Sequence, residues 1–284
     1  MAKIFKTILL LCGLSLTNLA LANQYIIDRL HKPVPGGVAV VTLDHLTSGA
    51  ELPQVTYQGH RVLVVKSDSN VMAIVGIPLK TASGQQAIDV KTGGKKQQVA
   101  FSVKPKKYKE QHIKLSSNKH VTPSAENQAR FKRELDEQLD AYAQFRQDSP
   151  SNVILDRPVQ GGRYSSPFGL RRFFNGQERN PHSGLDIAVP SGTPIKSSAD
   201  GVITVVGDFF FNGKTVFVDH GQGMISMYCH MSEIDVKKGQ TVKRGQVVGK
   251  VGSTGRSTGP HLHWNVSLNN VRVDPAIFVG AFKP

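Results

Sequence analysis

Residues 261–268 have the sequence His-Leu-His-Trp-Asn-Val-Ser-Leu, and this run decides the predicted fold. Apolar residues recur along it and the glycine-rich stretch 252–260 precedes it, as expected for a β-strand that follows a loop. In a strand, side chains two positions apart point to the same face, so His261 and His263 should face one site. Trp264 then points to the opposite face, where we expect it to pack in the core.

A second pair of metal-binding residue types lies upstream, in the sequence His-Ser-Gly-Leu-Asp at residues 182–186. Histidine and aspartate both bind zinc, and three intervening residues allow a bent strand to bring both side chains to one ion. His230 ends a further predicted strand. Each signal alone is weak, because a lone histidine is more often structural than catalytic. Together they supply three ligands and two further histidines, which fits a catalytic zinc ion with an open position.

The C-terminal part of the chain, residues 159–284, has a β pattern throughout. Strands are predicted at Val202–Val206, Lys214–Asp219, Met224–Met231 and Val247–Val251, with glycine-rich turns between them. No segment of this part has helical periodicity. We therefore expect an antiparallel β-sheet domain with long loops.

Alternation along residues 224–231 predicts which side chains of that strand share a face. It places His230 on the face of Tyr228 and puts Cys229 on the other, nearly all apolar face. Cys229 is therefore interpreted as a packed core thiol rather than a reactive group.

The segments upstream of residue 159 predict two further units. Residues 23–104 contain short apolar runs separated by glycine pairs and small polar turns, which indicates a small β-sandwich-like domain. Residues 105–158 predict a connector that begins as a basic linker or exposed edge strand. A helix follows, with Thr122 as its cap, Pro123 at its first position and apolar residues at helical spacing. The predicted fold is therefore mainly β, with a helical connector between two β domains.

Residues 1–22 have the pattern of an export signal. A short basic start with Lys3 and Lys6 precedes a largely apolar run, and Ala-Leu-Ala at residues 20–22 is a small-x-small cleavage site. We expect a mature chain that begins near Asn23 and is periplasmic or secreted; an uncleaved membrane anchor is the alternative. No later segment is long and apolar enough to span a bilayer.

The charge of the chain predicts the kind of partner. The formal net charge is +14, and loss of Lys3 and Lys6 with the signal leaves 14 − 2 = +12. A strongly basic exported protein is attracted to anionic polymers or membrane surfaces. Nucleic acid is excluded as a partner, because the chain is exported and contains no recognised nucleic-acid motif. Cleavage leaves only Cys229, so the mature chain cannot form an internal disulfide.

Longer motifs surround the candidate ligands. Ser-Pro-Phe-Gly-Leu-Arg-Arg at residues 166–172 precedes the first motif, and Ile-Ala-Val-Pro-Ser-Gly-Thr-Pro at residues 187–194 follows it. Tyr-Cys-His-Met occupies residues 228–231, and Gly-Ser-Thr-Gly-Arg-Ser-Thr-Gly-Pro occupies residues 252–260. This pattern resembles the M23 family of peptidoglycan endopeptidases, of the lysostaphin and LytM type, over about residues 163–274. The N-terminal β segment more loosely resembles the domain that precedes the peptidase in some members.

The resemblance implies that His182, Asp186 and His263 bind Zn2+ and that His230 and His261 are the catalytic histidines. It implies hydrolysis of peptide cross-links in peptidoglycan, with a D,D-endopeptidase favoured over cleavage of glycine bridges. We expect a monomer whose partner is peptidoglycan. The alternative is a non-catalytic LytM-type wall-binding or amidase-activating protein. Relatives of that kind lack one or more of these five residues, whereas this sequence has all of them.

The upstream segments suggest two forms of control. They either lie over the active site, as the resemblance to some relatives implies, or only position the enzyme on the cell wall. In the first case a side chain could occupy the open zinc position. Asn175, Gln177 and Glu178 are candidates because they precede His182.

Three other segments are interpreted from the sequence. His220 lies in a predicted hairpin turn, where we expect it to be structural or to support a site residue rather than to be catalytic. The aromatic run Phe209–Phe211 either walls a substrate groove or packs inward, and the sequence favours neither. Residues 236–249 resemble the hairpins of biotinyl and lipoyl carrier domains, but the modified-lysine motif of those carriers is absent.

Overall fold

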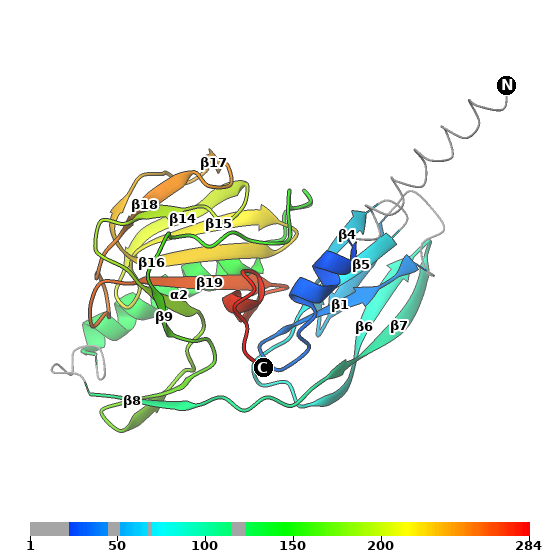
Figure 1. Cartoon of the computed structure of the whole chain (residues 1–284), viewed down its shortest axis with the longest axis horizontal. Coiled ribbons are helices and arrows are strands. Elements are labelled where there is room, and N and C mark those ends of the chain that lie inside the picture. The colour runs from blue at the N-terminus through cyan, green and yellow to red at the C-terminus, as the bar shows by residue number, and fades with distance from the viewer. Residues whose placement is uncertain (1–22, 45–51, 68–69, 115–122) are drawn as a thin grey trace.

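The computed structural model describes residues 23–44, 52–67, 70–114 and 123–284. Figure 1 shows two β-rich bodies joined by a long extended segment, with a single long helix, α2, beside the C-terminal body. The predicted fold class, mainly β with antiparallel sheets, is confirmed. The predicted export signal and the proposed helix cap Thr122 lie outside the described residues. No helix among the described residues is both long enough and apolar enough to cross a bilayer.

The N-terminal body contains two antiparallel sheets. One has the strand order β1 (Val38–Thr42), β5 (Asn70–Gly76) and β4 (Leu63–Ser67). The other has the order β3 (His60–Arg61), β2 (Gln54–Tyr57), β6 (Gly84–Thr92) and β7 (Lys95–Val103). Their facing sides enclose a core that includes Ala73, Val55 and Ile88. The prediction was wrong at the start of this part, because residues 23–30 are helical rather than β.

A ten-stranded sheet forms the C-terminal body. Its main path has the order β17 (Thr241–Val242), β14 (Gly201–Phe209), β15 (Gly213–Gly221), β16 (Met224–Ile234), β19 (Leu262–Leu268), β12 (Leu185–Ala188) and β9 (Arg163–Ser166). Three strands pair off this path, namely β13 (Pro194–Lys196), β18 (Val247–Val251) and β20 (Val271–Val273). The expectation of no helix here needs one correction, since a 3-10 helix, η3, spans Pro275–Ile277.

A second apolar cluster contains residues of both bodies. Strand β5 lies against β19 and β20, so Met72 and Ile74 belong to the same buried cluster as Val273 and Phe278. A buried side-chain amide also joins the bodies: Oδ1 of Asn269 accepts from the backbone N–H of Gly76 at 2.6 Å, and Nδ2 donates to the Gly76 carbonyl at 3.0 Å. This pair of bonds imitates a strand ladder and fixes the bodies against each other.

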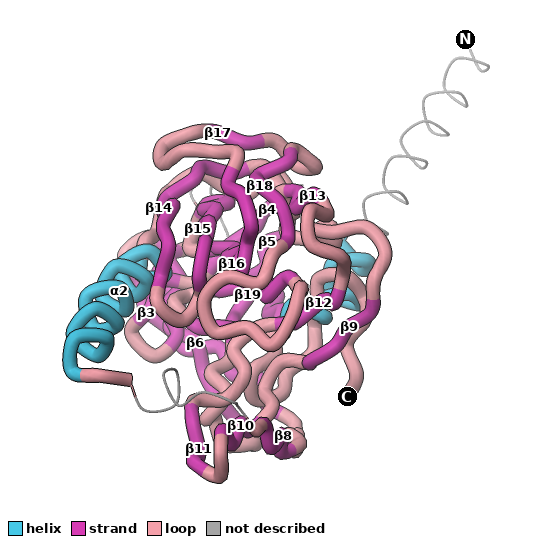
Figure 2. The backbone as a smooth tube through the Cα atoms, turned by 90° about the vertical axis from the view of Figure 1, so that its left-hand side faces the viewer, coloured by secondary structure: helices cyan, strands magenta, loops and turns pink. Residues whose placement is uncertain are grey.

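The connector packs against the C-terminal body in two places. Its strand β8 (Glu110–Ile113) pairs in parallel with β10 (Arg171–Phe174), which also pairs with β11 (Gln177–Arg179). Helix α2 (Ala125–Ala143) then runs along one flank of the main sheet, as Figure 2 shows.

Helix α2 begins at Ala125, where the side chain of Ser124 caps it by accepting a hydrogen bond from the N–H of Asn127 at 3.3 Å. Ala141 and Tyr142 are buried against the sheet, in a cluster that includes Phe217. The predicted helix is therefore present, but its cap lies after Pro123 rather than at Thr122, which is outside the described residues.

Candidate metal centre and active site

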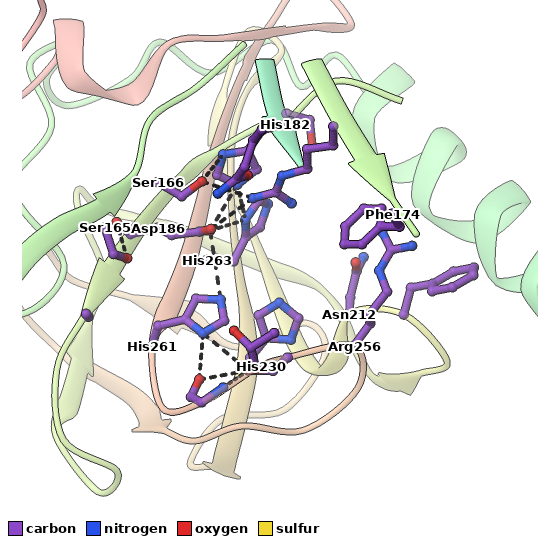
Figure 3. A pocket seen from close by; sticks show the side chains of 18 of the residues that line it. Ser165, Ser166, Phe174, His182, Asp186, Asn212, His230, Arg256, His261 and His263 are labelled. Atoms are coloured by element: carbon purple, nitrogen blue, oxygen red, sulfur yellow. Dashed lines mark hydrogen bonds and ion pairs between the residues drawn. The ribbon is translucent and has the colours of Figure 1, made fainter. Parts of the chain in front are cut away.

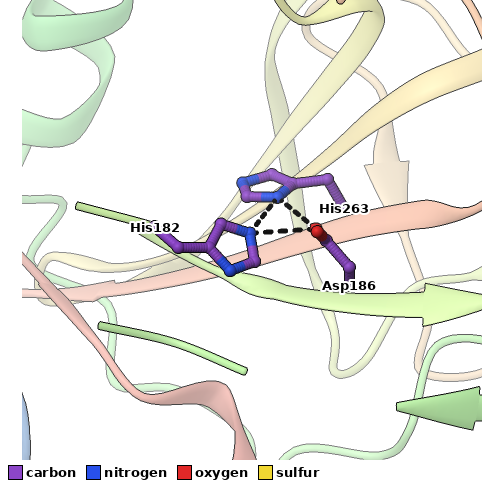
Figure 4. Close-up of side chains that lie close together, drawn as sticks. All are labelled: His182, Asp186 and His263. Carbon is purple, nitrogen blue, oxygen red and sulfur yellow. Dashed lines mark hydrogen bonds and ion pairs between the residues drawn. The ribbon is translucent and has the colours of Figure 1, made fainter. Parts of the chain in front are cut away.

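Three of the residues selected from the sequence meet at one point, as Figure 4 shows. His182 lies just before β12, Asp186 lies in β12, and His263 is its direct partner in β19. Oδ1 of Asp186 is 3.0 Å from Nε2 of His182 and 2.7 Å from Nδ1 of His263. The two nitrogens are 3.0 Å apart. All three residues are buried.

The atoms of this triad fit a tetrahedral metal ion. Nδ1 of His182 donates to the carbonyl oxygen of Pro167 at 2.8 Å, so Nε2 carries a lone pair that faces the other two ligand atoms. Ligands at about 2.0–2.1 Å around a tetrahedral ion lie about 3.3 Å apart, close to the observed spacing. Gly184 is required within the motif, because a Cβ there would lie 2.5 Å from the carbonyl oxygen of Trp264 and 2.8 Å from the His263 ring.

Arg172 contacts the triad, although no sequence pattern indicated it. Its Nη2 donates to Oδ2 of Asp186 at 3.0 Å and to Oγ of Ser166 at 3.1 Å. Oδ1 of Asp186 is thereby left for a metal ion. Burial by itself would raise the pKa of the Asp186 carboxyl, yet interactions with His182 and His263 hold that pKa well below its ordinary value. The carboxylate is therefore ionised and able to bind a cation.

His230 and His261 lie beside the triad, with ring centroids 4.8 Å apart. Nδ1 of His230 donates to the carbonyl of Thr254, and Nδ1 of His261 donates to the carbonyl of Gly259, each at 2.8 Å. Both rings therefore carry the lone pair on Nε2 when neutral. Nε2 of His261 lies 3.9 Å from Oδ1 of Asp186.

A bulge in β16, which strand alternation did not predict, places His230 beside the triad. The three steps along β16 from Tyr228 to Met231 oppose only two steps along β15, so β16 bulges, and His230 has a positive φ of 59°. Tyr228 and Met231 therefore both belong to the main core, while Cys229 pairs with His263 on the other face. The prediction that His230 shares a face with Tyr228 was wrong, because the bulge turns it toward His263.

Burial keeps two of the histidines neutral. It lowers the pKa of His230 to about 3, with further lowering from the neighbouring His263 and His261. Burial likewise lowers the pKa of His263 to about 4, against the opposing attraction of Asp186. At neutral pH both imidazoles are uncharged, which is the form that binds a metal ion or accepts a proton.

These residues line a cleft of about 400 Å³, which we call the metal cleft. Figure 3 shows that His230 and His261 lie on one side of the triad, and that Arg256 lies with Phe174 and Asn212. Among the described residues, Gln111 of β8 is the single contribution from the chain upstream of residue 159. The described part of the two N-terminal sheets contributes no lining residue.

Comparison with known proteins agrees with this arrangement. Residues 180–275 match Peptidase family M23, and residues 31–106 match the Peptidase family M23 N-terminal domain. A crystal structure of a Pseudomonas aeruginosa protein described as peptidase M23 is 52% identical in sequence, with a TM-score of 0.78. The alignment covers 91% of this chain and 100% of that one. The chain belongs to peptidase family M23.

Two curated relatives of this M23 family member have been named for their activity. Peptidoglycan DD-endopeptidase ShyA of Vibrio cholerae is 46% identical over 121 residues, which are 42% of this chain and 28% of ShyA. DD-carboxypeptidase/endopeptidase Mpg of Neisseria meningitidis is 44% identical over 118 residues, which are 42% of this chain and 27% of Mpg. The aligned part therefore spans little more than a quarter of each relative.

The structure of this M23 chain also shows the surroundings of four other features that were interpreted from the sequence. Cys229 is fully buried, and burial raises the pKa of its thiol to about 12, as expected for a packed core residue. Trp264 is buried in the main core. In the aromatic run, Phe209 packs inward, which confirms that interpretation, while Phe211 lines the metal cleft. His220 is structural: its ring bonds to the Asp200 carbonyl and to Ser226.

The three candidates for the open metal position do not line the metal cleft. Asn175 forms the turn between β10 and β11, with φ of 49°. Gln177 and Glu178 begin β11 and are exposed, and Glu178 pairs with Arg171 at 2.9 Å.

Proposed function

We propose that this M23 family member is a zinc metalloendopeptidase that hydrolyses the peptide cross-links of bacterial peptidoglycan as a D,D-endopeptidase. The observation that carries the proposal is the convergence of His182, Asp186 and His263 in one cleft, with His230 and His261 beside them. The names of the curated relatives support peptidoglycan as the substrate class.

Zinc is the ion we propose for the triad. Two neutral imidazoles and one carboxylate are a usual ligand set for a catalytic zinc ion, with one position left for water or substrate. When bound, zinc would supply a Lewis acid that polarises the scissile carbonyl and lowers the pKa of water. Arg172 would keep Asp186 in the orientation that presents Oδ1 to the ion.

His230 and His261 are proposed as the groups that handle protons. The carbonyls of Thr254 and Gly259 hold their Nδ1 atoms, so each Nε2 can accept a proton from the attacking water. The same side chains, once protonated, would stabilise the negative charge that develops on the carbonyl oxygen and return a proton to the departing amine.

The remaining features of the chain fit this proposal. We propose an export signal at residues 1–22, an N-terminal β domain at 23–104, a connector at 105–158 and the peptidase domain at 159–284. The protein would act as a monomer in the periplasm or outside the cell. Its positive charge would favour contact with the anionic cell wall.

The decisive experiment uses purified peptidoglycan whose stem peptides are cross-linked through D-alanine and diaminopimelate. The mature protein, loaded with zinc, should convert cross-linked dimers to monomers, and mass spectrometry should identify the new ends. Removal of zinc with a chelator should stop the reaction, and added zinc should restore it. A product whose new ends do not lie at the D-alanyl cross-link would contradict the proposed bond.

The alternative function is a non-catalytic wall-binding or amidase-activating protein of the LytM type. It predicts binding of the zinc-loaded protein to sacculi without release of any muropeptide. It also predicts that addition of the protein raises the activity of an amidase, and that His230→Ala does not abolish this effect.

A further inference from the structure

A second cleft lies beside the metal cleft, between helix α2 and the main sheet, with a volume of about 720 Å³. We call it the helix-side cleft. Phe131, Leu135 and Leu139 of α2 form its apolar wall. Residues that line both clefts include Phe211, Asn212, Arg256 and His263. A peptide seated at the metal ligands can therefore continue into the helix-side cleft past Arg256.

Most of the charged side chains that line the two clefts are cationic. Among the described residues that line them, Asp186 is the one carboxylate, and the metal triad and Arg172 already engage it. The cationic residues that line them are Arg172, Arg179, Arg256 and Arg272. Positive side chains in a concave, partly apolar site attract an anionic ligand and repel a cationic one.

Arg256 is the arginine at the junction of the two clefts. Its backbone N–H donates to the carbonyl of Phe211 at 2.8 Å, which fixes the loop that carries it. The centre of its guanidinium lies 4.8 Å from the ring centroid of Phe174 and 4.5 Å from that of Phe211. Aromatic rings stack on the flat face of a guanidinium group. The N–H donors of the guanidinium group lie in its plane, where they can bind a planar carboxylate.

The charge on Arg256 persists despite its surroundings. Burial, together with the positive charges of Arg172 and Arg179, lowers its pKa to about 10, which still leaves it protonated at neutral pH. An anionic ligand close to Arg256 would offset part of this repulsion.

We propose that Arg256 binds the substrate carboxylate next to the scissile nitrogen, and that the enzyme thereby selects its bond. This inference rests on the proposed function. Hydrolysis of a D-alanyl–diaminopimelate bond adds water across the amide and releases an amine whose adjacent carbon carries a carboxylate. A glycine bridge has no carboxylate at that place. Arg256 accordingly favours the first kind of cross-link over the second, and the apolar wall of α2 accommodates the aliphatic chain that follows.

The test compares two probes in binding experiments. Both are cross-linked muropeptide dimers, identical except that the diaminopimelate carboxyl next to the cross-link nitrogen is free in one and amidated in the other. Calorimetry with the metal-free mature protein measures affinity without turnover. A charge-assisted hydrogen bond predicts roughly ten- to hundred-fold tighter binding of the free acid by the wild type. Equal affinity for the two dimers, or binding of neither, would contradict the proposal.

Variants identify the residue responsible for the preference. Arg256→Gln should reduce the affinity ratio of acid to amide to near one. Arg256→Lys, which keeps the charge but not the planar donors, should give an intermediate ratio. Arg133→Gln, an exposed arginine on α2 outside both clefts, makes the same charge change and should leave the ratio as in the wild type. An unchanged ratio in Arg256→Gln would overturn the assignment.

Cleavage by the zinc-loaded protein separates this proposal from the proposed function. If neither dimer is cleaved while the acid is bound more tightly than the amide, the proposed function fails and the carboxylate site stands. If both dimers are cleaved with the same kcat/KM and bound equally, the proposed function stands and the role of Arg256 is refuted.

Discussion

Nη2 of Arg172 donates a hydrogen bond to Oδ2 of Asp186 at 3.0 Å, on the side of the carboxylate away from the two histidines. The side chain of Arg172 is 17% exposed and that of Asp186 is 10% exposed, so water screens this pair only weakly. The bond holds one carboxylate oxygen and leaves the other facing the two histidines. Under the proposed function, Arg172 would act on a bound metal ion through Asp186 and not as a ligand.

Replacement of Arg172 by Met should weaken zinc binding while leaving all three ligands in place. Loss of a group that orients a metal ligand typically costs about 10- to 100-fold in metal affinity. Competition with a chromophoric chelator measures this affinity directly. Arg171→Met is the matched control, because the neighbouring Arg171 is exposed and pairs with Glu110 and Glu178 instead. Equal zinc affinity in the two variants would contradict the role of Arg172.

The ligand assignment itself predicts the metal content of a second variant. His263→Ala removes one of the three ligand atoms, so the purified protein should hold far less than one zinc ion per chain. Elemental analysis after gel filtration gives the ratio. His60→Ala, at an exposed position of the N-terminal body, should keep the full content. A stoichiometric zinc content in His263→Ala would exclude His263 as a ligand.

Catalysis should be separable from metal binding. His230→Ala and His261→Ala should each retain zinc and fold normally but cleave muropeptides more slowly, by roughly a hundred- to ten-thousand-fold. Comparison of zinc content, thermal melting and kcat for each variant with the wild type provides the test. If both variants cleaved at nearly the wild-type rate, these residues would have no part in the mechanism.

Two pairs of residues in the candidate site could be predicted because the two members of each pair lie close together in sequence. The two-residue spacing of His261 and His263 and the spacing of His182 and Asp186 depend on local strand geometry, which a sequence pattern reports well. The position of His230 could not be obtained in this way. Its side chain turns toward His263 because β16 has one residue more than β15 between two pairing points, and this bulge cannot be recognised before the strands are paired.

Contacts between segments that are distant in the sequence could not be predicted from the sequence patterns either. Nothing around Asn269 indicates that its amide completes hydrogen bonds with the backbone of Gly76. Arg172 belongs to a pair of arginines that the motif contains, yet no spacing rule distinguishes it from Arg171. Short apolar runs separated by turn residues predicted the N-terminal sheets, but not that one of them packs on the peptidase core.

Stability should depend on pH through His220. Burial lowers the pKa of this histidine below its ordinary value of 6.5, so the unfolded chain binds the proton more readily than the folded one. The contribution of His220 to stability is therefore complete above about pH 6.5 and is lost as the pH falls below that value. Urea unfolding with a chelator present gives the free energy of unfolding at about pH 8 and about pH 5. The decrease in this free energy between the two pH values should be smaller for His220→Gln than for the wild type. Equal decreases would contradict the role of His220 in the pH dependence.

The shared core also predicts the behaviour of a peptidase fragment that starts at Asn152. If the upstream segments covered the active site, this fragment would cleave soluble muropeptides faster than the mature protein. The described N-terminal sheets do not line the metal cleft, however, and their removal would expose Val273 and Phe278 together with their neighbours. Each large apolar side chain so exposed costs about 1.5–3 kcal/mol.

We therefore expect the fragment to melt at a clearly lower temperature than the mature protein, and to cleave no faster at a temperature where both are folded. Thermal unfolding followed by circular dichroism gives the first quantity, and hydrolysis of a soluble muropeptide dimer gives the second. Asn269→Ala in the mature chain is the companion variant, since it removes the bonds to Gly76 without exposing the core. It should lower the melting temperature less than the truncation does. A fragment as stable as the mature protein, with faster cleavage, would favour occlusion of the active site by the upstream segments over their structural role.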